Sequence, residues 1–159
     1  MSLSYSQKGL AILAQVKRSE NMSFRSDRQA NLMKGTINHI PPFATQHTYM
    51  LASIYPYGTE KAANEWAFQG EIRYTWKRGT AMGGRYGTTL KLNASHIRGT
   101  GDRWWEMTKE PYYTDVNIEL NKKINKQWYI GAMAMYQTYN KSVIEGHGDL
   151  VRRRNMCLS

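Results

Sequence analysis

Residues 65–78 read Glu-Trp-Ala-Phe-Gln-Gly-Glu-Ile-Arg-Tyr-Thr-Trp-Lys-Arg. Apolar and polar side chains alternate along this stretch, and a period of two is the pattern of a β-strand with two different faces. A helix would distribute the same residues around its whole circumference. We therefore predict a strand over residues 65–78.

The two faces of this predicted strand differ in chemistry. The apolar face suits lipid, and its predicted lipid-facing residues are Trp66, Phe68, Ile72, Tyr74 and Trp76. The polar face suits a barrel interior, and its predicted lumen-facing residues are Gln69, Glu71, Arg73, Thr75 and Lys77. Opposite charges on such a face pair across strands, either as structural ion pairs or as a selectivity lining for anionic solutes.

The length of the stretch favours a membrane-spanning strand over a strand of a soluble sheet. Soluble strands usually have about 5–6 residues, whereas a tilted strand crosses a bilayer with about 9–11. Ten residues at about 3.3 Å each, tilted by about 40°, rise roughly 25 Å, which is the height of the apolar band of a membrane barrel. The alternative is a long twisted strand of a soluble sandwich whose core side chains are aromatic.

The rest of the chain repeats the same unit of strand and turn. We predict about eight strands, at a short segment ending near Tyr5 and at 10–24, 30–40, 47–56, 65–78, 88–98, 113–124 and 128–144. Each connection is too short for a parallel crossover helix, so the strands are expected to form an antiparallel up-and-down meander. The predicted fold is all-β, a partial or small outer-membrane β-barrel over residues 1–148, followed by an irregular basic tail over 149–159.

A meander places alternate connections at opposite ends of the sheet. One end is expected to hold residues 7–9, 41–46, 79–87 and 125–127. The other is expected to hold residues 25–29, 57–64 and 99–112, the last being the longest connection. Long loops at one end are typical of the outer rim of a bacterial barrel.

Composition is compatible with this fold and excludes a bundle of membrane helices. The mean hydropathy is -0.65, and 41% of the residues are hydrophobic. The chain has 11 Tyr and 5 Trp but only 3 Phe, and Tyr and Trp suit boundaries between water and an apolar phase. The first residues show neither a charged segment nor a long apolar segment, so no secretory signal is expected. Cys157 is the only cysteine, which excludes an internal disulfide.

The net charge of +10 points to an anionic partner or to a solvated basic face. Nucleic acid and lipopolysaccharide are two such anionic partners. For a membrane barrel, the expected partners are the lipid bilayer and, as a further candidate, lipopolysaccharide, with no nucleic acid.

A search for catalytic or metal-binding patterns finds none. The four histidines have no neighbours at metal-ligand spacing, although His39 and His47 flank Pro41-Pro42. Ser95 and His96 are adjacent on a predicted strand, so they point to opposite faces and cannot form a nucleophile and base pair. We predict no catalytic, cofactor-binding or metal-binding residues, and no enzyme.

Two loops have alternative interpretations. Trp104-Trp105, with Asp102 and Glu106 nearby, is either a sugar-stacking platform or an interfacial packing pair. The glycine-rich stretch 79–87 lacks the Gly-Lys-Ser/Thr ending of a phosphate-binding loop, so a hairpin connection that uses glycines for positive φ is expected there.

Several stretches resemble the uncharacterised outer-membrane β-barrel proteins of Bacteroidetes, which have no assigned activity. They are residues 17–25, 46–49, 65–70, 77–80, 83–88, 139–141 and 144–146, which together span about residues 1–148. The family members are several times longer and carry a signal peptide and further strands. The resemblance implies that this chain is a fragment of such a barrel, located in the bacterial outer membrane, with a structural or pore-related role. The second hypothesis is a soluble β-sandwich or barrel that binds an anionic polymer or carbohydrate.

Overall fold

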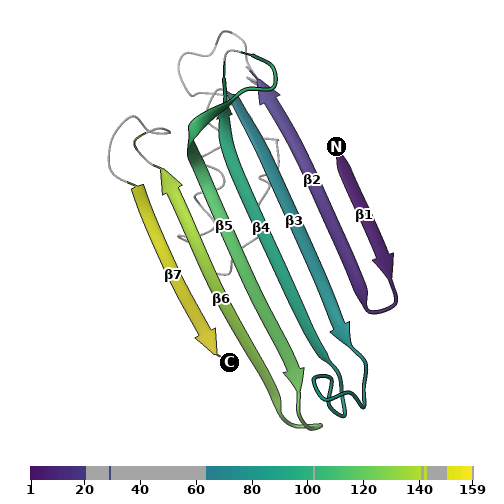
Figure 1. The fold of residues 1–159 in the computed structure, drawn as a ribbon. Helices are drawn as coiled ribbons and strands as arrows, with labels where there is room; N and C mark the ends of the chain where they lie inside the picture. Colours follow the sequence, from purple (N-terminus) through teal and green to yellow (C-terminus); the bar gives the residue numbers. More distant parts are fainter. Residues whose placement is uncertain (21–28, 30–63, 102, 141, 143–149, 159) are drawn as a thin grey trace.

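The computed structural model describes residues 1–20, 29, 64–101, 103–140, 142 and 150–158. Within them the chain forms one antiparallel sheet whose strands pair in chain order (Figure 1). The strands are β1 (Ser2–Gln7), β2 (Leu10–Glu20), β3 (Asn64–Trp76), β4 (Thr88–Thr100), β5 (Met107–Lys123), β6 (Tyr129–Asn140) and β7 (Leu150–Leu158). The predicted all-β antiparallel meander is confirmed, but β1 and β7 lie at opposite edges and the sheet is open.

Strand β3 covers Asn64–Trp76 and pairs with β2 on one side and β4 on the other. It ends earlier than the sequence pattern indicates. The hydroxyl of Thr80 donates to the carbonyl oxygen of Lys77 at 2.8 Å, and Gly79 has a φ of 82°. These two features turn the chain out of the sheet, so Lys77, predicted to be a lumen-facing strand residue, lies one residue beyond the end of β3, and its lumen-facing position stays a prediction.

Strands β2 and β3 are neighbours in the sheet, paired from Leu10↔Tyr74 to Glu20↔Asn64. The predicted meander instead placed strands 30–40 and 47–56 between them. Both segments lie outside the described residues. Because β2 pairs with β3 along its whole length, no further strand can stand between them, and the predicted neighbour order is corrected at this point.

The hairpin of β4 and β5 is longer than the sequence pattern indicates. The sequence predicts a loop over residues 99–112, but β4 continues to Thr100 and β5 begins at Met107. Pro111 lacks a backbone N–H, which argues against a regular strand. The structure accommodates this proline opposite Arg98, where the register shifts on both sides of the pair. An irregular ladder of this kind leaves no clean alternation in the sequence.

The C-terminal segment is a strand rather than an irregular tail. Strand β7 pairs with β6 from Asn140↔Leu150 to Ala132↔Leu158. The prediction of an irregular tail over 149–159 rested on the lack of side-chain alternation. Backbone hydrogen bonds to β6 form the strand without that pattern, because every residue of the segment carries an N–H and a carbonyl group.

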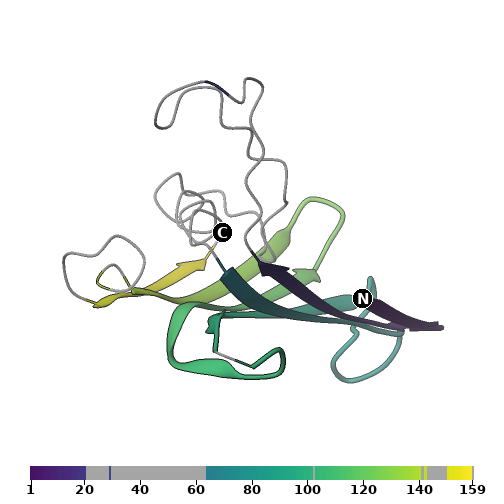
Figure 2. The same ribbon diagram turned by 90° about the horizontal axis from the view of Figure 1, so that it is seen from above.

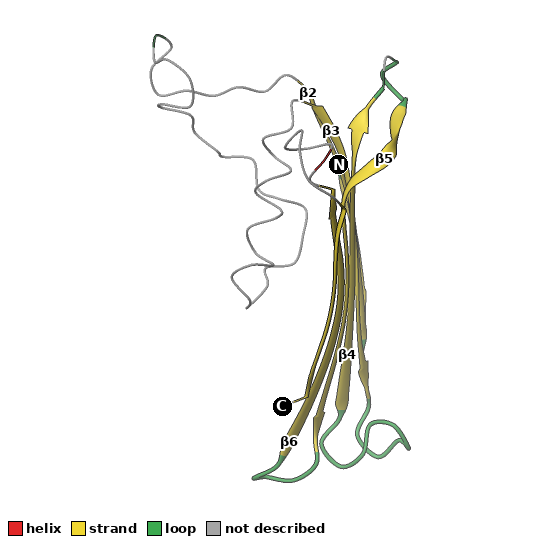
Figure 3. Ribbon diagram, turned by 90° about the vertical axis from the view of Figure 1, so that its left-hand side faces the viewer, coloured by secondary structure: helices red, strands yellow, loops and turns green. Residues whose placement is uncertain are grey.

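The sheet is a single layer, seen from above in Figure 2 and edge-on in Figure 3. One end holds the connections β1–β2, β3–β4 and β5–β6, and the other holds β2–β3, β4–β5 and β6–β7 (Figure 1). The predicted grouping of 7–9, 79–87 and 125–127 at one end is therefore confirmed. At the opposite end the β4–β5 hairpin bends away from the plane of the other strands (Figure 3).

Helices of the length and apolarity needed to cross a membrane are not found among the described residues.

Candidate membrane-facing surface

One face of the sheet is built from residues that the register places side by side across four strands. Its middle row consists of Ile12, Ile72, Leu92 and Ile118, which are Cα partners in succession. Directly opposed residues of antiparallel strands project from the same face. We call the face that carries the Ile72 side chain the apolar face. It includes every second residue of each strand, counted from the residues that the register sets opposite Ile72.

Large hydrophobic side chains are exposed on the apolar face. Ile72 is 41% exposed and Ile118 is 44% exposed, although both lie in the middle of long paired strands. The exposed large hydrophobic residues on this face are Leu3, Tyr5, Ile12, Ile72, Tyr74, Val116, Ile118, Leu120 and Ile130. A contiguous exposed apolar surface of this kind marks contact with a partner or a membrane.

Aromatic pairs stand at both ends of the apolar face on β3. Trp66 and Phe68 are stacked with ring centroids 6.0 Å apart, at the end near β2–β3. Tyr74 and Trp76 meet edge to face at 4.9 Å, at the other end. The five residues predicted to face lipid therefore share one face, with two aromatic pairs separated by Gly70 and Ile72.

The opposite face, which we call the polar face, carries most of the buried side chains among the described residues. Its buried members are Glu65, Ala67, Asn93, Ser95, Ile97, Tyr113, Asp115, Asn117, Met135, Gln137 and Tyr139. A sheet that packs on a soluble core has the reverse arrangement, with apolar side chains buried and polar side chains exposed. Gln69, Glu71, Arg73 and Thr75, predicted to face a lumen, lie on this face in β3.

Ion pairs connect the strands on the polar face. Nζ of Lys17 on β2 lies 2.9 Å from Oε1 of Glu65, whose side chain is only 2% exposed. Glu71 lies 3.8 Å from Nζ of Lys91 on β4 and 3.9 Å from the guanidinium of Arg73 on its own strand. The expected pairing of opposite charges across strands is present here.

An aromatic cluster on the polar face was not anticipated from the sequence. Ala67, Ile97, Tyr113 and Tyr139 lie in one row across β3 to β6 and are all buried. Nε2 of Gln137 donates to the Tyr113 hydroxyl at 2.7 Å. The alternation within 113–124 could have placed Tyr113 on this face, but only the register joins it to the neighbouring strands.

Several buried polar side chains on this face have no hydrogen-bond partner among the described residues. Within the described part of the chain, the amides of Asn93 and Asn117 and the hydroxyl of Ser95 have no hydrogen-bond partner, although all three residues are buried. Buried polar groups of this kind need water or further protein groups. Their position suits the wall of a hydrated interior.

The structure also locates several residues considered for chemistry. Ser95 and His96 face opposite sides, since Ser95 pairs with Gln69 and His96 with Phe68. His39, His47 and His147 lie outside the described residues, and no cluster of three potential metal ligands occurs among those that are described.

Two connections, β3–β4 and β4–β5, contain the glycine-rich stretch and the tryptophan pair. Gly79, Gly84 and Gly87 have positive φ, which confirms the hairpin interpretation of 79–87. Trp104 and Trp105 meet edge to face at 5.3 Å and are both exposed, and Asp102 lies outside the described residues.

Comparison with protein families gives a single description. Residues 1–157 match the model of a family described as a family of unknown function, DUF6029. The match includes β7 as far as Cys157, although the sequence pattern predicts an irregular tail over residues 149–159. Comparisons with curated proteins and with solved structures give no match.

Proposed function

We propose that this chain, which belongs to the DUF6029 family, forms part of the wall of an outer-membrane β-barrel. The apolar face would contact lipid, and the polar face would line the barrel interior. The role is structural or related to a pore, and the proposal includes no catalytic step.

The observation that carries the proposal is the inverted distribution of side chains between the two faces. Ile72 and Ile118 are exposed, whereas Glu65, Asn93 and Asp115 are buried on the opposite side. In water, burying polar groups while exposing a broad apolar surface is unfavourable on both counts. In a bilayer the apolar face loses no hydrophobic stabilisation, and a hydrated interior solvates the polar face.

Strand length and the aromatic pairs support the same orientation. From Trp66 to Trp76 the strand rises about 33 Å, or roughly 25 Å along the membrane normal at a tilt near 40°. This matches the height of the apolar band of a barrel, and aromatic residues occupy both of its edges.

A barrel wall requires partners for its two edge strands. β1 and β7 lie at opposite edges of the described sheet. Unpaired backbone groups at a lipid-exposed edge cost several kcal/mol each, so a sheet in a bilayer must be closed. We propose that further strands, from this chain or from a second copy of it, pair with these two edges.

The test compares substitutions at adjacent positions on the two faces of β3. Ile72→Lys is expected to block insertion of the whole chain into lipid vesicles, because a lysine near the bilayer midplane costs about 2–4 kcal/mol. Arg73→Ala is the control and is expected to insert normally, since this side chain lies on the polar face.

Insertion is measured by co-flotation with vesicles after an alkaline wash that removes peripheral proteins. A wild-type chain that stays soluble without detergent, with both variants behaving like it, would support a soluble anion-binding protein instead.

A further inference from the structure

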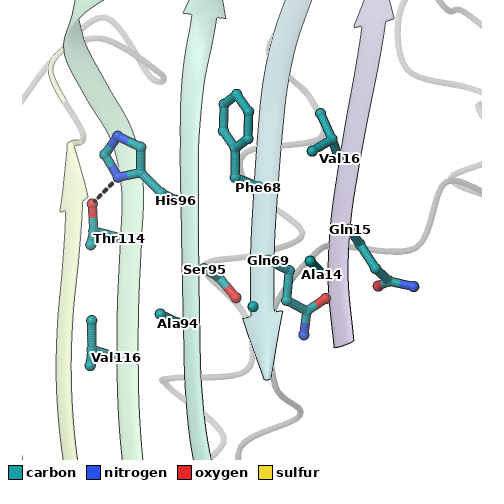
Figure 4. A pocket seen from close by; sticks show the side chains of 11 residues that line it. Ala14, Gln15, Val16, Phe68, Gln69, Ala94, Ser95, His96, Thr114 and Val116 are labelled. Atoms are coloured by element: carbon teal, nitrogen blue, oxygen red, sulfur yellow. Dashed lines mark hydrogen bonds between the residues drawn. The ribbon is translucent and has the colours of Figure 1, made fainter. Parts of the chain in front are cut away.

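A hollow lies on the apolar face between the middle row of Ile72 and the row of Trp66, and its lining includes Phe68 and Ala94 (Figure 4). Its volume is about 380 Å³, and Ala14, Gly70 and Ala94 form its floor across three neighbouring strands. A Cβ built on Gly70 meets no atom within 4 Å. Phe68 and Val116 border the hollow, which opens on the surface proposed to face lipid.

Two arginines lie on the same face as this hollow, farther along the strands toward the β2–β3 connection. Arg18, Trp66 and Arg98 are Cα partners in one row across β2, β3 and β4, at the end near the β2–β3 connection. The guanidinium of Arg18 lies 5.7 Å from the centroid of the Trp66 ring. The apolar face therefore ends, at this edge, in two cations on either side of an indole.

Hydrogen bonds orient the Arg98 side chain. Its Nε donates to Nε2 of His96 at 2.7 Å. Because that imidazole nitrogen accepts, a neutral His96 carries its proton on Nδ1, which then donates to the Thr114 hydroxyl at 2.9 Å (Figure 4). The arginine is thus held by a short chain of uncharged groups.

The charges at this edge are incompletely balanced. Arg18 pairs with Glu20, whose side chain is half exposed. Within the described part of the chain, no carboxylate lies within ion-pair distance of Arg98. Among the described residues, Arg98 therefore has no ionic partner at the border of the proposed apolar band, where an anionic group would be attracted.

The spacing between the arginines and the hollow suits an amphiphile with an anionic end. Arg98 and Ala94 are four residues apart on β4, which is about 13 Å along the strand. An acyl chain entering the hollow would therefore leave its headgroup level with Arg18 and Arg98. Guanidinium groups bind phosphate oxygens with two parallel hydrogen bonds, which favours a phosphate over other headgroups.

We propose that this surface binds one phosphorylated membrane lipid. Arg18 and Arg98 would hold its phosphate, and an acyl chain would occupy the hollow above Gly70. The inference rests on the proposed function, because the apolar face must front a bilayer for the lipid to reach it.

The test measures lipid binding to the whole chain reconstituted in phosphatidylcholine nanodiscs. The probe is lipid A, which carries phosphates and acyl chains, and inorganic phosphate is the comparison for the headgroup alone. Arg98→Gln is expected to weaken lipid A binding roughly tenfold to a hundredfold, since a hydrogen bond between two charged groups is lost. Arg103→Gln, an exposed arginine of the β4–β5 connection at the same end, is the control and is expected to bind like wild type.

A second variant tests the hollow separately from the charges. Gly70→Leu fills space that the wild type leaves open, so it is expected to weaken lipid A binding several-fold while insertion is unchanged. Inorganic phosphate is expected to compete poorly, because it cannot occupy the hollow.

The outcomes separate the two proposals. A chain that does not insert into the nanodiscs overturns the proposed function and this inference together. A chain that inserts but binds lipid A equally well with Arg98→Gln and Arg103→Gln overturns the lipid site alone. Equal binding by the wild type and Gly70→Leu, or full displacement by millimolar phosphate, overturns the role of the hollow.

Discussion

Nζ of Lys17 on β2 lies 2.9 Å from the carboxylate of Glu65 on β3, and the Glu65 side chain is only 2% exposed. The pair lies next to the buried Ala67, on the face opposite the exposed hydrophobic residues. A buried charge persists only with a partner, so this contact is expected to govern the stability of the β2–β3 pairing.

Lys17→Met is expected to lower the free energy of unfolding by roughly 3 kcal/mol, because it leaves the Glu65 carboxylate buried without its cation. Glu20→Gln is the control, since it removes an exposed pair with Arg18 and is expected to cost less than about 1 kcal/mol. Urea unfolding in detergent, followed by tryptophan fluorescence, measures both changes. Equal losses would show that the buried position of Glu65 has no special importance.

Tyr113→Phe tests the aromatic cluster of the polar face. The substitution removes the hydroxyl that accepts from the Gln137 amide, and both side chains are almost fully buried. We expect a loss of about 1–2 kcal/mol in the free energy of unfolding. Tyr5→Phe removes an exposed hydroxyl that contacts Gln7 and is expected to have no measurable effect in the same assay. Unchanged stability of the Tyr113 variant would contradict the assigned hydrogen bond.

The β1–β2 turn depends on glycine at position 9. Gly9 has a φ of 89°, and a Cβ built there would lie 3.0 Å from the Thr75 carbonyl oxygen. Gly9→Ala is therefore expected to cost about 1–3 kcal/mol, seen as a lower melting temperature by circular dichroism. Gly70→Ala, where the added methyl meets nothing within 4 Å, is expected to be neutral or slightly stabilising. A Gly9→Ala variant with the melting temperature of the wild type would contradict the requirement for glycine in this turn.

Two isoleucines of similar exposure distinguish a bilayer from water as the solvent of the apolar face. Ile118 is 44% exposed in the middle of β5, and Ile124 is 51% exposed in the β5–β6 connection. In a membrane, Ile118→Lys is expected to make the free energy of insertion less favourable by about 2–4 kcal/mol. Residue 124 lies beyond the apolar band, so Ile124→Lys is expected to have little effect. Folding yield into vesicles of defined composition measures the difference. Indistinguishable yields are the result expected of a soluble sheet.

Side-chain alternation predicted the described strands that have two chemically different faces. The pattern in 65–78 located β3 and assigned Trp66 and Glu71 to opposite faces, which agrees with the pairing of β3 and β4. The alternation of 113–124 located most of β5 in the same way. Periodicity of two is a local property, so a single sequence reveals it directly.

Strand neighbours, irregular strands and strands without alternation could not be predicted in this way. The pairing of β2 with β3 joins residues that are distant in the chain, and nothing local specifies it. Pro111 interrupts the pattern of β5, and the arginine-rich β7 shows no alternation. The row that brings Arg18 beside Trp66 and Arg98 depends on two registers, so this candidate lipid site was invisible in the sequence.

The most direct measurement is a scan of β5 with nitroxide labels in lipid bilayers. In a Cys157→Ser background, single cysteines replace residues 115–121 in turn, and collisions with oxygen and with a water-soluble nickel complex are recorded for each label. The even positions, among them Ile118, are expected to show high oxygen and low nickel accessibility, with the odd positions reversed in a period of two. If nickel reached Ile118 and its even-numbered neighbours as readily as the odd positions, the apolar face would not front lipid and the barrel-wall assignment would be wrong.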